Sequence, residues 1–334
     1  MSWKVLITAG PMNVVGQAGL ELLKGAGCEI VEPPRQGFLN EQELLGILPG
    51  IDAALAGVDK YSAAVLGSSS ASSLKIVSRW GVGYDAIDIP KATELGIVVA
   101  NTPGLLDEAV ADYAFALLFA LARRIHEGHD LMRRGEWRMV WGADIAGRTL
   151  GILGCGRIGQ AVARRAAGFN LRLLGHDIAP QPAAEKLGVQ FVPLDELLAQ
   201  SDFLTLHAAL TPQNRGLIGE AQLRRMKPTA LLINTARGAL VDEAALVRAL
   251  NGGWLAGAAL DAYATEPLPA DHPLRQAPNT LLTPHLASYG RETGAKVSLA
   301  AAQAIVHLLQ GRRPQFVVNR EVFGSANLRT KCAG

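Results

Sequence analysis

The sequence contains few cysteines and few aromatic residues, almost no net charge and no long apolar run. Its three cysteines, Cys28, Cys155 and Cys332, have neither metal-ligand spacing nor a CxxC pair, so we expect no metal site and a reducing, cytoplasmic location. A formal net charge of +2 gives no support for nucleic acid or membrane partners. The apolar stretch 114–122 is too short to cross a bilayer, and no secretory signal is expected before the strand pattern at 5–8.

Two series of short apolar runs alternate with helical patterns along the 334 residues. The first series predicts strands at 4–8, 28–31, 52–56, 75–78 and 97–100, with helices that include 14–24 and 41–48. The second predicts strands at 149–153, 172–176, 203–207, 230–235, 257–261 and 280–283, with helices that include 194–200, 220–226 and 243–251. This alternation predicts an α/β protein with two doubly wound parallel-sheet domains.

A longer helical pattern lies between the two series, at residues 107–134. Its first half is apolar nearly all round, so it must be buried in a core or against another subunit. We therefore expect an obligate homodimer. A last helix is predicted at about 292–309.

A glycine-rich loop between the strands at 149–153 and 172–176 carries the strongest functional signal. Gly154, Gly156 and Gly159 form a G-x-G-x-x-G pattern that opens a helix, and Asp177 ends the next strand, 18 residues after Gly159. This arrangement is typical of a dinucleotide-binding βαβ unit, in which the helix N-terminus binds the pyrophosphate. The acid is expected to accept hydrogen bonds from the adenosine ribose, which favours NAD as cofactor.

Each glycine of this loop has its own expected task. Gly154 allows a tight turn, Gly156 lets the pyrophosphate approach the backbone, and Gly159 lets the helix pack closely on the sheet. Cys155 has two open interpretations, a small apolar filler or a thiol whose pKa is lowered at a helix N-terminus.

Three polar residues of the second series follow predicted strands. They are Arg237, Glu266 and His285. Loops at the carboxyl ends of parallel strands line the ligand crevice, so these side chains are expected to converge. A histidine can exchange a proton with a substrate hydroxyl, a carboxylate can orient the imidazole, and a guanidinium can bind a substrate carboxylate. Together these residue types suit hydride transfer at a carbon that bears a hydroxyl.

The ordered motifs resemble those of the D-2-hydroxyacid dehydrogenases over residues 4–320. The matching segments are 79–88, 101–104, 154–159, 234–238, 261–267 and 283–288. Among the branches of that family, the chain is most similar to short phosphoglycerate dehydrogenases and glyoxylate/hydroxypyruvate reductases. The resemblance implies interconversion of a small (R)-2-hydroxy acid and its 2-oxo acid. It also implies a discontinuous, flavodoxin-like substrate-binding domain (1–100 and 290–334) and a Rossmann NAD domain (101–289) with a dimerisation arm at about 107–146.

The resemblance also implies residue roles. His285 is the acid/base, Glu266 its partner and Arg237 the substrate anchor. Further substrate contacts are expected from Arg79, Val82 and Gly83. The remaining residues expected to bind the cofactor, besides the three glycines and Asp177, are Arg157, Ile158, His207, Thr235, Ala236, Asp261 and Ser288.

Other functions on the same scaffold stay open at this point. One alternative is a phosphite-type dehydrogenase; formate oxidation is disfavoured because formate enzymes of this family carry glutamine where this chain has Glu266. Another is an NAD-sensing corepressor-like binding protein. The identity of the acid is also open, since aromatic residues near Tyr61, Trp80 and Trp141 are candidates to shape the pocket.

Overall fold

The computed structural model describes residues 2–35, 39–179 and 181–330, and Cys332 lies outside them. The chain divides into two compact units. Unit 1 contains Met1–Leu106 and Tyr289–Gly334, and unit 2 contains Asp107–Ser288. Each unit is built on its own parallel sheet, which confirms the predicted fold class.

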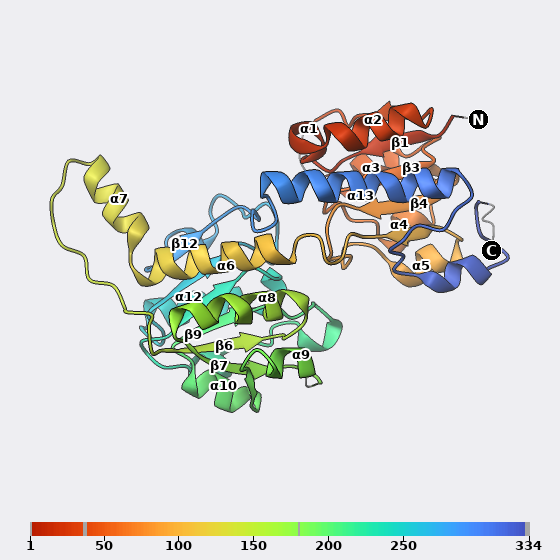
Figure 1. Cartoon of the computed structure of the whole chain (residues 1–334). Helices are drawn as coiled ribbons and strands as arrows, with labels where there is room; N and C mark the ends of the chain where they lie inside the picture. Colours follow the sequence, from red (N-terminus) through yellow and green to blue (C-terminus); the bar gives the residue numbers. More distant parts are fainter. Residues whose placement is uncertain (1, 36–38, 180, 331–334) are drawn as a thin grey trace. The chain divides into compact units, whose positions relative to one another are not determined.

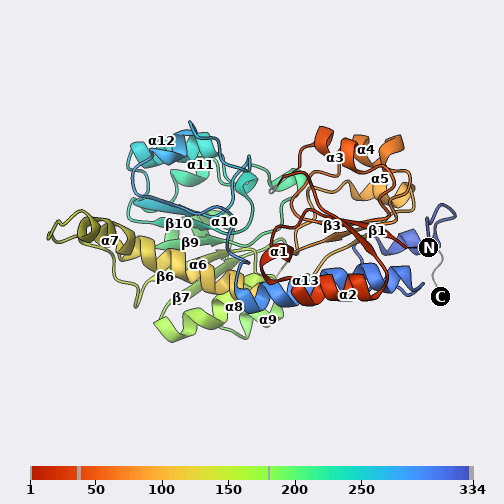
Figure 2. The ribbon, with the colours of Figure 1, turned by 90° about the horizontal axis from the view of Figure 1, so that it is seen from above.

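Unit 1 has a five-stranded parallel sheet in the order β2-β1-β3-β4-β5. The strands are β1 (Lys4–Ile7), β2 (Glu29–Val31), β3 (Ala53–Ala56), β4 (Ile76–Arg79) and β5 (Val98–Ala100). One face is covered by α1 (Met12–Val15), α2 (Gln17–Gly25) and α13 (Arg291–Leu309), and the other by α3 (Glu41–Ile47), α4 (Ala63–Leu66) and α5 (Ile89–Glu94) (Figures 1 and 2). The strand order reverses between β1 and β3, where ligands of such sheets bind.

Unit 2 has a seven-stranded parallel sheet in the order β12-β11-β10-β9-β6-β7-β8. Its strands are β6 (Thr149–Leu153), β7 (Arg172–His176), β8 (Gln190–Phe191), β9 (Phe203–Leu206), β10 (Leu231–Asn234), β11 (Gly257–Leu260) and β12 (Thr280–Leu282). One face packs on α6 (Asp107–Ala122) and α8 (Arg157–Ala166), and the other on α10 (Leu194–Gln200), α11 (Glu220–Leu223) and α12 (Glu243–Asn251) (Figure 2). Short α9 (Pro182–Glu185) precedes β8.

The prediction of one helix over residues 107–134 is wrong in one respect. The helix ends at Ala122, and α7 (Ile125–Arg133) begins after a break at Arg124, whose φ of 51° lies in the left-handed region. Residues 14–24 are likewise interrupted, at Gly16, where a Cβ would lie 2.6 Å from the Met12 carbonyl oxygen. Local periodicity was correct, but it did not reveal where the backbone turns.

The apolar surface of α6 is explained by unit 2 itself. Its buried side chains pack with those of α8 and of the sheet in one core cluster. The apolar helix is therefore no evidence for a dimer, because unit 2 buries it without a second subunit.

A buried carboxylate organises the carboxyl edge of the unit 1 sheet. Asp59 is only 2% exposed and accepts hydrogen bonds from the Thr8 hydroxyl, from Leu39 N at 2.8 Å and from Gly57 N at 3.1 Å. Thr8 follows β1 and Gly57 follows β3, so the contacts hold together the loops on both sides of the point where the strand order reverses.

The segment after α13 is anchored beside β5 by Asn319, which is fully buried. Its side-chain oxygen accepts from Val99 N at 2.8 Å, and its amide nitrogen donates to the Ile97 carbonyl at 2.9 Å and to the Thr93 hydroxyl at 3.0 Å. In the part of the chain that the structure describes, none of the helices is both long and apolar enough to cross a membrane.

Replacing Asn319 by Ala should lower the free energy of unfolding by about 1–3 kcal/mol, since it leaves the buried Val99 N–H without its acceptor. The exposed neighbour Arg320→Ala should change it by less than about 0.5 kcal/mol. Urea unfolding followed by circular dichroism measures both variants. Equal midpoints for the two would contradict the anchoring role.

Candidate active site

The carboxyl ends of six strands in unit 2 form one row across the sheet. Backbone pairing connects, in order, Leu282, Leu260, Asn234, Leu206, Leu153 and His176. The residues that follow these ends therefore lie along one edge; they are Thr283, Asp261, Thr235, His207, Gly154 and Asp177. Register thus gathers most of the predicted cofactor residues at the place where open α/β sheets bind ligands.

The glycine loop has the geometry that its sequence predicts. Gly154 has a φ of 90°, and a Cβ there would lie 2.4 Å from Ala208 N. At Gly159 a Cβ would lie 2.2 Å from the Gly154 carbonyl oxygen, so the helix packs on the strand only because a side chain is absent. A Cβ at Gly156 would meet no atom within 4 Å, which leaves open space before the N-terminus of α8. Arg157 and Ile158 form the first turn of that helix.

Asp177 faces the glycine loop. One of its carboxylate oxygens accepts a hydrogen bond from Cys155 N at 2.7 Å, which holds the acid against the loop. The Cys155 thiol is buried, and burial together with the charge of Asp177 raises its pKa to about 12. The alternative of a thiol activated at the helix N-terminus is therefore wrong, and Cys155 acts as a small buried side chain.

Two buried polar atoms on the same edge have no hydrogen-bond partner within the described structure. They are the Thr235 hydroxyl and Nδ1 of His207, whose Nε2 lies 2.9 Å from the Thr205 hydroxyl. Burial lowers the pKa of His207 to about 3, so its ring is neutral. Buried polar atoms of this kind normally find a partner, and their position fits a polar ligand along this edge.

His285 and Glu266 form a pair at the ends of β12 and β11. Nδ1 of His285 lies 2.7 Å from Oε2 of Glu266, and the side chains are 27% and 18% exposed. The other carboxylate oxygen accepts from Tyr263 N at 2.9 Å. This geometry directs the Nδ1 proton to the carboxylate and leaves Nε2 to exchange a proton with a ligand.

The pKa of Glu266 is lower than that of an ordinary glutamate. Burial by itself would raise it, but the hydrogen bond and charge of His285, the Tyr263 N–H and the charge of Arg237 together lower it. The carboxylate is therefore ionised at neutral pH and accepts the Nδ1 hydrogen bond of His285 as a charged acceptor.

The loop that carries His285 is fixed by hydrogen bonds to Asp261, which is 1% exposed. One oxygen accepts from the Thr283 hydroxyl at 2.6 Å and Leu286 N at 2.8 Å, and the other accepts from Ala287 N at 2.8 Å. His285 has a φ of 55°, which is uncommon for a residue with a side chain, and these contacts surround that turn. The structure thus shows Asp261 as a support of the His285 loop.

Other supports were not foreseen from the sequence. The Tyr263 hydroxyl lies 3.0 Å from the carbonyl oxygens of both Leu260 and Thr283 and shares its one proton between them, and so connects the ends of β11 and β12. Asn234 is fully buried; its side chain accepts from Ala236 N at 3.0 Å and donates to the Arg237 carbonyl at 2.9 Å. The signal that the sequence offered for both is their place in the matching segments 234–238 and 261–267.

Arg237 is half-buried after β10, and its Nη1 donates to the Ala236 carbonyl at 2.8 Å. Ser288 is half-buried just after the His285 loop. In unit 1, Arg79 is 8% exposed at the end of β4 and lies against Gly81, while Val82 and Gly83 follow as half-buried residues.

Comparison with known proteins settles the family. Residues 115–287 match the model of the D-isomer specific 2-hydroxyacid dehydrogenase NAD-binding domain. A glyoxylate reductase of Pyrococcus furiosus is 44% identical over 334 residues (96% of this chain, 97% of the relative), and one of Korarchaeum cryptofilum is 49% identical over 260 residues (76% and 78%). The chain belongs to the D-isomer specific 2-hydroxyacid dehydrogenases.

A solved member of this dehydrogenase family has the same fold over nearly the whole chain. The crystal structure of a glyoxylate reductase from Paecilomyes thermophila has a TM-score of 0.83 and 32% identity, covering 96% of this chain and 99% of that one. The chain is thus an oxidoreductase acting on CH–OH, with NAD as its cofactor. The open space at Gly156, the Thr235 hydroxyl and Nδ1 of His207 fit a dinucleotide at this edge.

Two of the aromatic residues expected to shape the dehydrogenase's pocket are buried. Tyr61 is fully buried in the core of unit 1. Trp80 is 4% exposed, donates from its indole nitrogen to the Ser298 hydroxyl at 2.9 Å and packs edge-on against Tyr289. Any effect of Tyr61 on specificity is therefore indirect.

Replacing Glu266 by Gln should lower the melting temperature at pH 7 but have less effect near pH 3. The folded pKa of Glu266 is lowered, so its stabilising contribution is present above the unfolded value of about 4.5 and is lost as pH falls through the folded pKa. Differential scanning calorimetry of wild type and variant at both pH values measures this. A melting difference that is the same at pH 7 and pH 3 would show that the charge of Glu266 contributes nothing.

Proposed function

We propose that the chain is an NAD-dependent reductase of glyoxylate or hydroxypyruvate, converting a small 2-oxo acid to the corresponding 2-hydroxy acid. The observation that carries the proposal is the His285–Glu266 pair at 2.7 Å, on the sheet edge that bears the glycine loop. Support for the substrate class comes from the relatives named glyoxylate reductase.

In the direction of reduction, Nε2 of His285 donates a proton to the carbonyl oxygen of the substrate. Glu266 orients the ring through Nδ1 and stabilises the positive charge that precedes proton transfer. NADH, when bound, supplies the hydride that reduces the carbonyl carbon. In the reverse direction the neutral imidazole accepts the hydroxyl proton.

Arg237 binds the substrate carboxylate, because a guanidinium offers two parallel N–H donors to its two oxygens. Unit 1 acts as the substrate-binding domain and contributes the backbone N–H groups of Val82 and Gly83, and unit 2 acts as the NAD domain. We also propose that Arg79 contacts the substrate and that Ser288 contacts NAD. The buried position of Arg79 favours a small substrate over 3-phosphoglycerate, since the side chain lies against its own loop.

A panel of 2-oxo acids with NADH tests the substrate class. Glyoxylate and hydroxypyruvate should give the highest kcat/KM. Turnover with phosphite and NAD in place of these acids would favour the phosphite alternative. NADH binding without turnover of any acid would favour the corepressor-like alternative.

We propose a cytoplasmic location, because Cys28 and Cys155 are both buried free thiols, as is usual in a reducing compartment.

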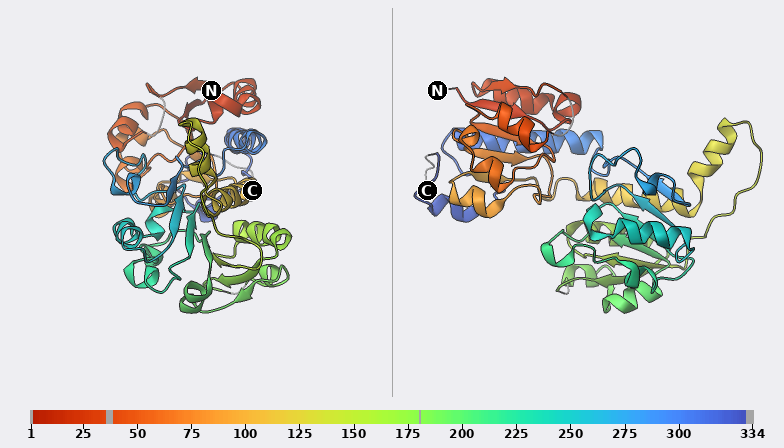
Figure 3. Two further views of the ribbon diagram at one scale, coloured as in Figure 1. Left: turned by 90° about the vertical axis from the view of Figure 1, so that its left-hand side faces the viewer. Right: turned by 180° about the vertical axis from the view of Figure 1, so that it is seen from behind.

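The protein acts as a homodimer through the outer part of the arm expected at about 107–146. This outer part is formed by α7 and residues 134–146, since α6 is packed in the core of unit 2. Figure 3 shows this arm extending away from the sheet of unit 2. It exposes Trp137, Met139 and Trp141 by 83%, 76% and 88%, and such a cluster of apolar side chains favours a protein partner.

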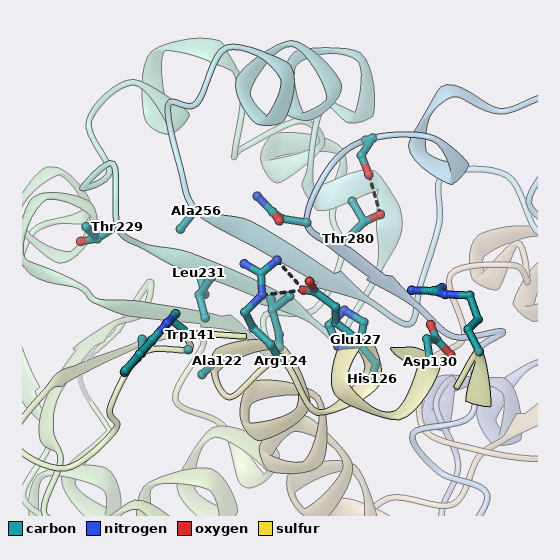
Figure 4. A pocket seen from close by; sticks show the side chains of 16 residues that line it. Ala122, Arg124, His126, Glu127, Asp130, Trp141, Thr229, Leu231, Ala256 and Thr280 are labelled. Atoms are coloured by element: carbon teal, nitrogen blue, oxygen red, sulfur yellow. Dashed lines mark hydrogen bonds and ion pairs between the residues drawn. The ribbon is translucent and has the colours of Figure 1, made fainter. Parts of the chain in front are cut away.

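A hollow of about 370 Å³ lies between the arm and the amino ends of β10, β11 and β12 (Figure 4). His285 follows the carboxyl end of β12, so the hollow is at the opposite end of these strands. Trp141 lines this hollow, together with the ion pair of Arg124 and Glu127, in which Nε of Arg124 donates to Oε2 of Glu127 at 2.6 Å. A second copy of the chain is the partner that we propose for the arm and this hollow.

Replacing His285 by Ala should lower kcat for glyoxylate reduction by roughly a hundredfold or more, because general acid catalysis is lost. The dissociation constant of NADH, measured by fluorescence titration, should change by less than about threefold. His307→Ala on α13 is the matched control and should keep wild-type turnover. An His285→Ala enzyme within about threefold of wild type would remove His285 from the mechanism.

Light scattering at micromolar concentration should give twice the mass of the chain. The double variant Trp137→Glu, Trp141→Glu should shift the mass toward the monomer, since it places charges where apolar contacts are buried. Replacing the exposed Lys24 by Glu on α2 controls for the added charge. A wild-type monomer would refute the dimer.

A further inference from the structure

The carboxylate that orients His285 belongs to an irregular loop. Glu266 lies in residues 261–272, between β11 and the turn of 3-10 helix at Pro273–Arg275, and this stretch contains neither helix nor strand. The position of the carboxylate therefore depends on the contacts that hold the loop. Tyr263 anchors its first part, and Arg275 donates to the carbonyls of Leu268 and Pro269 at 2.8 Å near its end.

The middle of the loop is held by a second glutamate, Glu243. Its Oε1 accepts a hydrogen bond from Ala264 N at 2.7 Å, two residues before Glu266. Its Oε2 lies 3.3 Å from Nε2 of His272, at the far end of the same loop. The Glu243 side chain is 13% exposed, and its one carboxylate contacts both arms of the loop.

Glu243 is itself well fixed. It is the first residue of α12, directly after Asp242, whose side chain accepts from Ala245 N at 2.9 Å and caps the helix. The buried side chains of α12 belong to the core of unit 2. Nδ1 of His272 accepts from Leu274 N at 3.3 Å, which directs the proton of a neutral ring to Nε2 and so toward Glu243.

A carboxylate suits this task because it only accepts hydrogen bonds, and a charged acceptor forms a shorter and stronger bond to a backbone N–H than a neutral one. Without Glu243, the Ala264 N–H is exposed to water and the loop loses its link to α12. Tyr263 directly precedes Ala264, and its backbone N–H donates to Glu266. A shift of the loop at Ala264 is thereby passed to the carboxylate that orients His285.

We propose that Glu243 is a positioning residue, which acts on the reaction only by holding Glu266 toward His285. The expected effect on turnover rests on the proposed function. The expected effect on the position of Glu266 rests only on the contacts of Glu243 with Ala264 and His272.

A double-mutant cycle tests the proposal. Glu243→Ala should lower kcat about tenfold and leave the dissociation constant of NADH within twofold. In the Glu266→Gln background the same substitution should change kcat by less than about twofold, because the group that it positions is gone. Equal losses in both backgrounds, or no loss in either, would overturn the proposal.

Two further variants separate positioning from general damage. Glu243→Gln keeps an acceptor for Ala264 N and should recover most of the turnover. Glu220→Ala removes another glutamate from the first turn of a helix, one that pairs with Arg224 and Arg248 instead of the loop, and should keep wild-type kcat. If Glu243→Ala does not fold, Glu243→Asp takes its place, since it keeps the charge at the helix N-terminus but is one methylene shorter.

A readout without turnover distinguishes this proposal from the proposed function. In protein labelled with ¹⁵N-histidine, the ring signals of His285, assigned by their loss in His285→Ala, should report a proton on Nδ1. Glu243→Ala should move them toward their positions in Glu266→Gln, and Glu220→Ala should not. Unmoved signals would overturn the positioning role. Moved signals in a protein that reduces no 2-oxo acid would support positioning and reject the proposed function.

Discussion

The in-register parallel pairing of six strands in unit 2 is the constraint on which the candidate site depends. Parallel strands end at one edge of the sheet. Backbone pairing of the strands therefore brings residues that are far apart along the chain close together at that edge, and no contact between their side chains is needed for this. Gly154, Asp177, Thr235 and His285 reach the same edge for this reason. A slip of one residue in any pairing would move the following loop and turn its side chains to the other face.

Buried carboxylates then define the loops that this edge presents. Asp261 accepts three hydrogen bonds below His285, and Asp59 accepts three at the corresponding edge of unit 1. Irregular loops expose backbone N–H groups that no strand or helix satisfies, and each of these two carboxylates satisfies two of them together with a threonine hydroxyl. The same chemistry is seen at Glu266 and Glu243, which each accept from a backbone N–H of one loop.

Several expectations changed once the long-range contacts were known. The apolar helix at 107–122 suggested a subunit interface, but its surface is buried in the core of unit 2, and the exposed apolar residues lie farther along in the arm. For Cys155 the sequence left open a small apolar filler or a reactive thiol, and burial beside Asp177, which raises its pKa, favours the filler. In each case the local pattern was real, while the surroundings that decide its consequence come from distant parts of the chain.

The sequence by itself determined the alternation of strands and helices, the glycine loop and the polar residues at strand ends, because these depend on backbone preferences and burial within a few residues. The sequence also led us to expect Glu266 as the partner of His285, 19 residues away, and the tertiary structure supplied the contact itself. Tertiary structure alone decided that Asp261 supports the His285 loop and that Glu243 contacts Ala264, 21 residues away. Such pairs depend on strand register and on the path of irregular loops. No short-range pattern encodes that path, since it results from the packing of whole elements on one sheet.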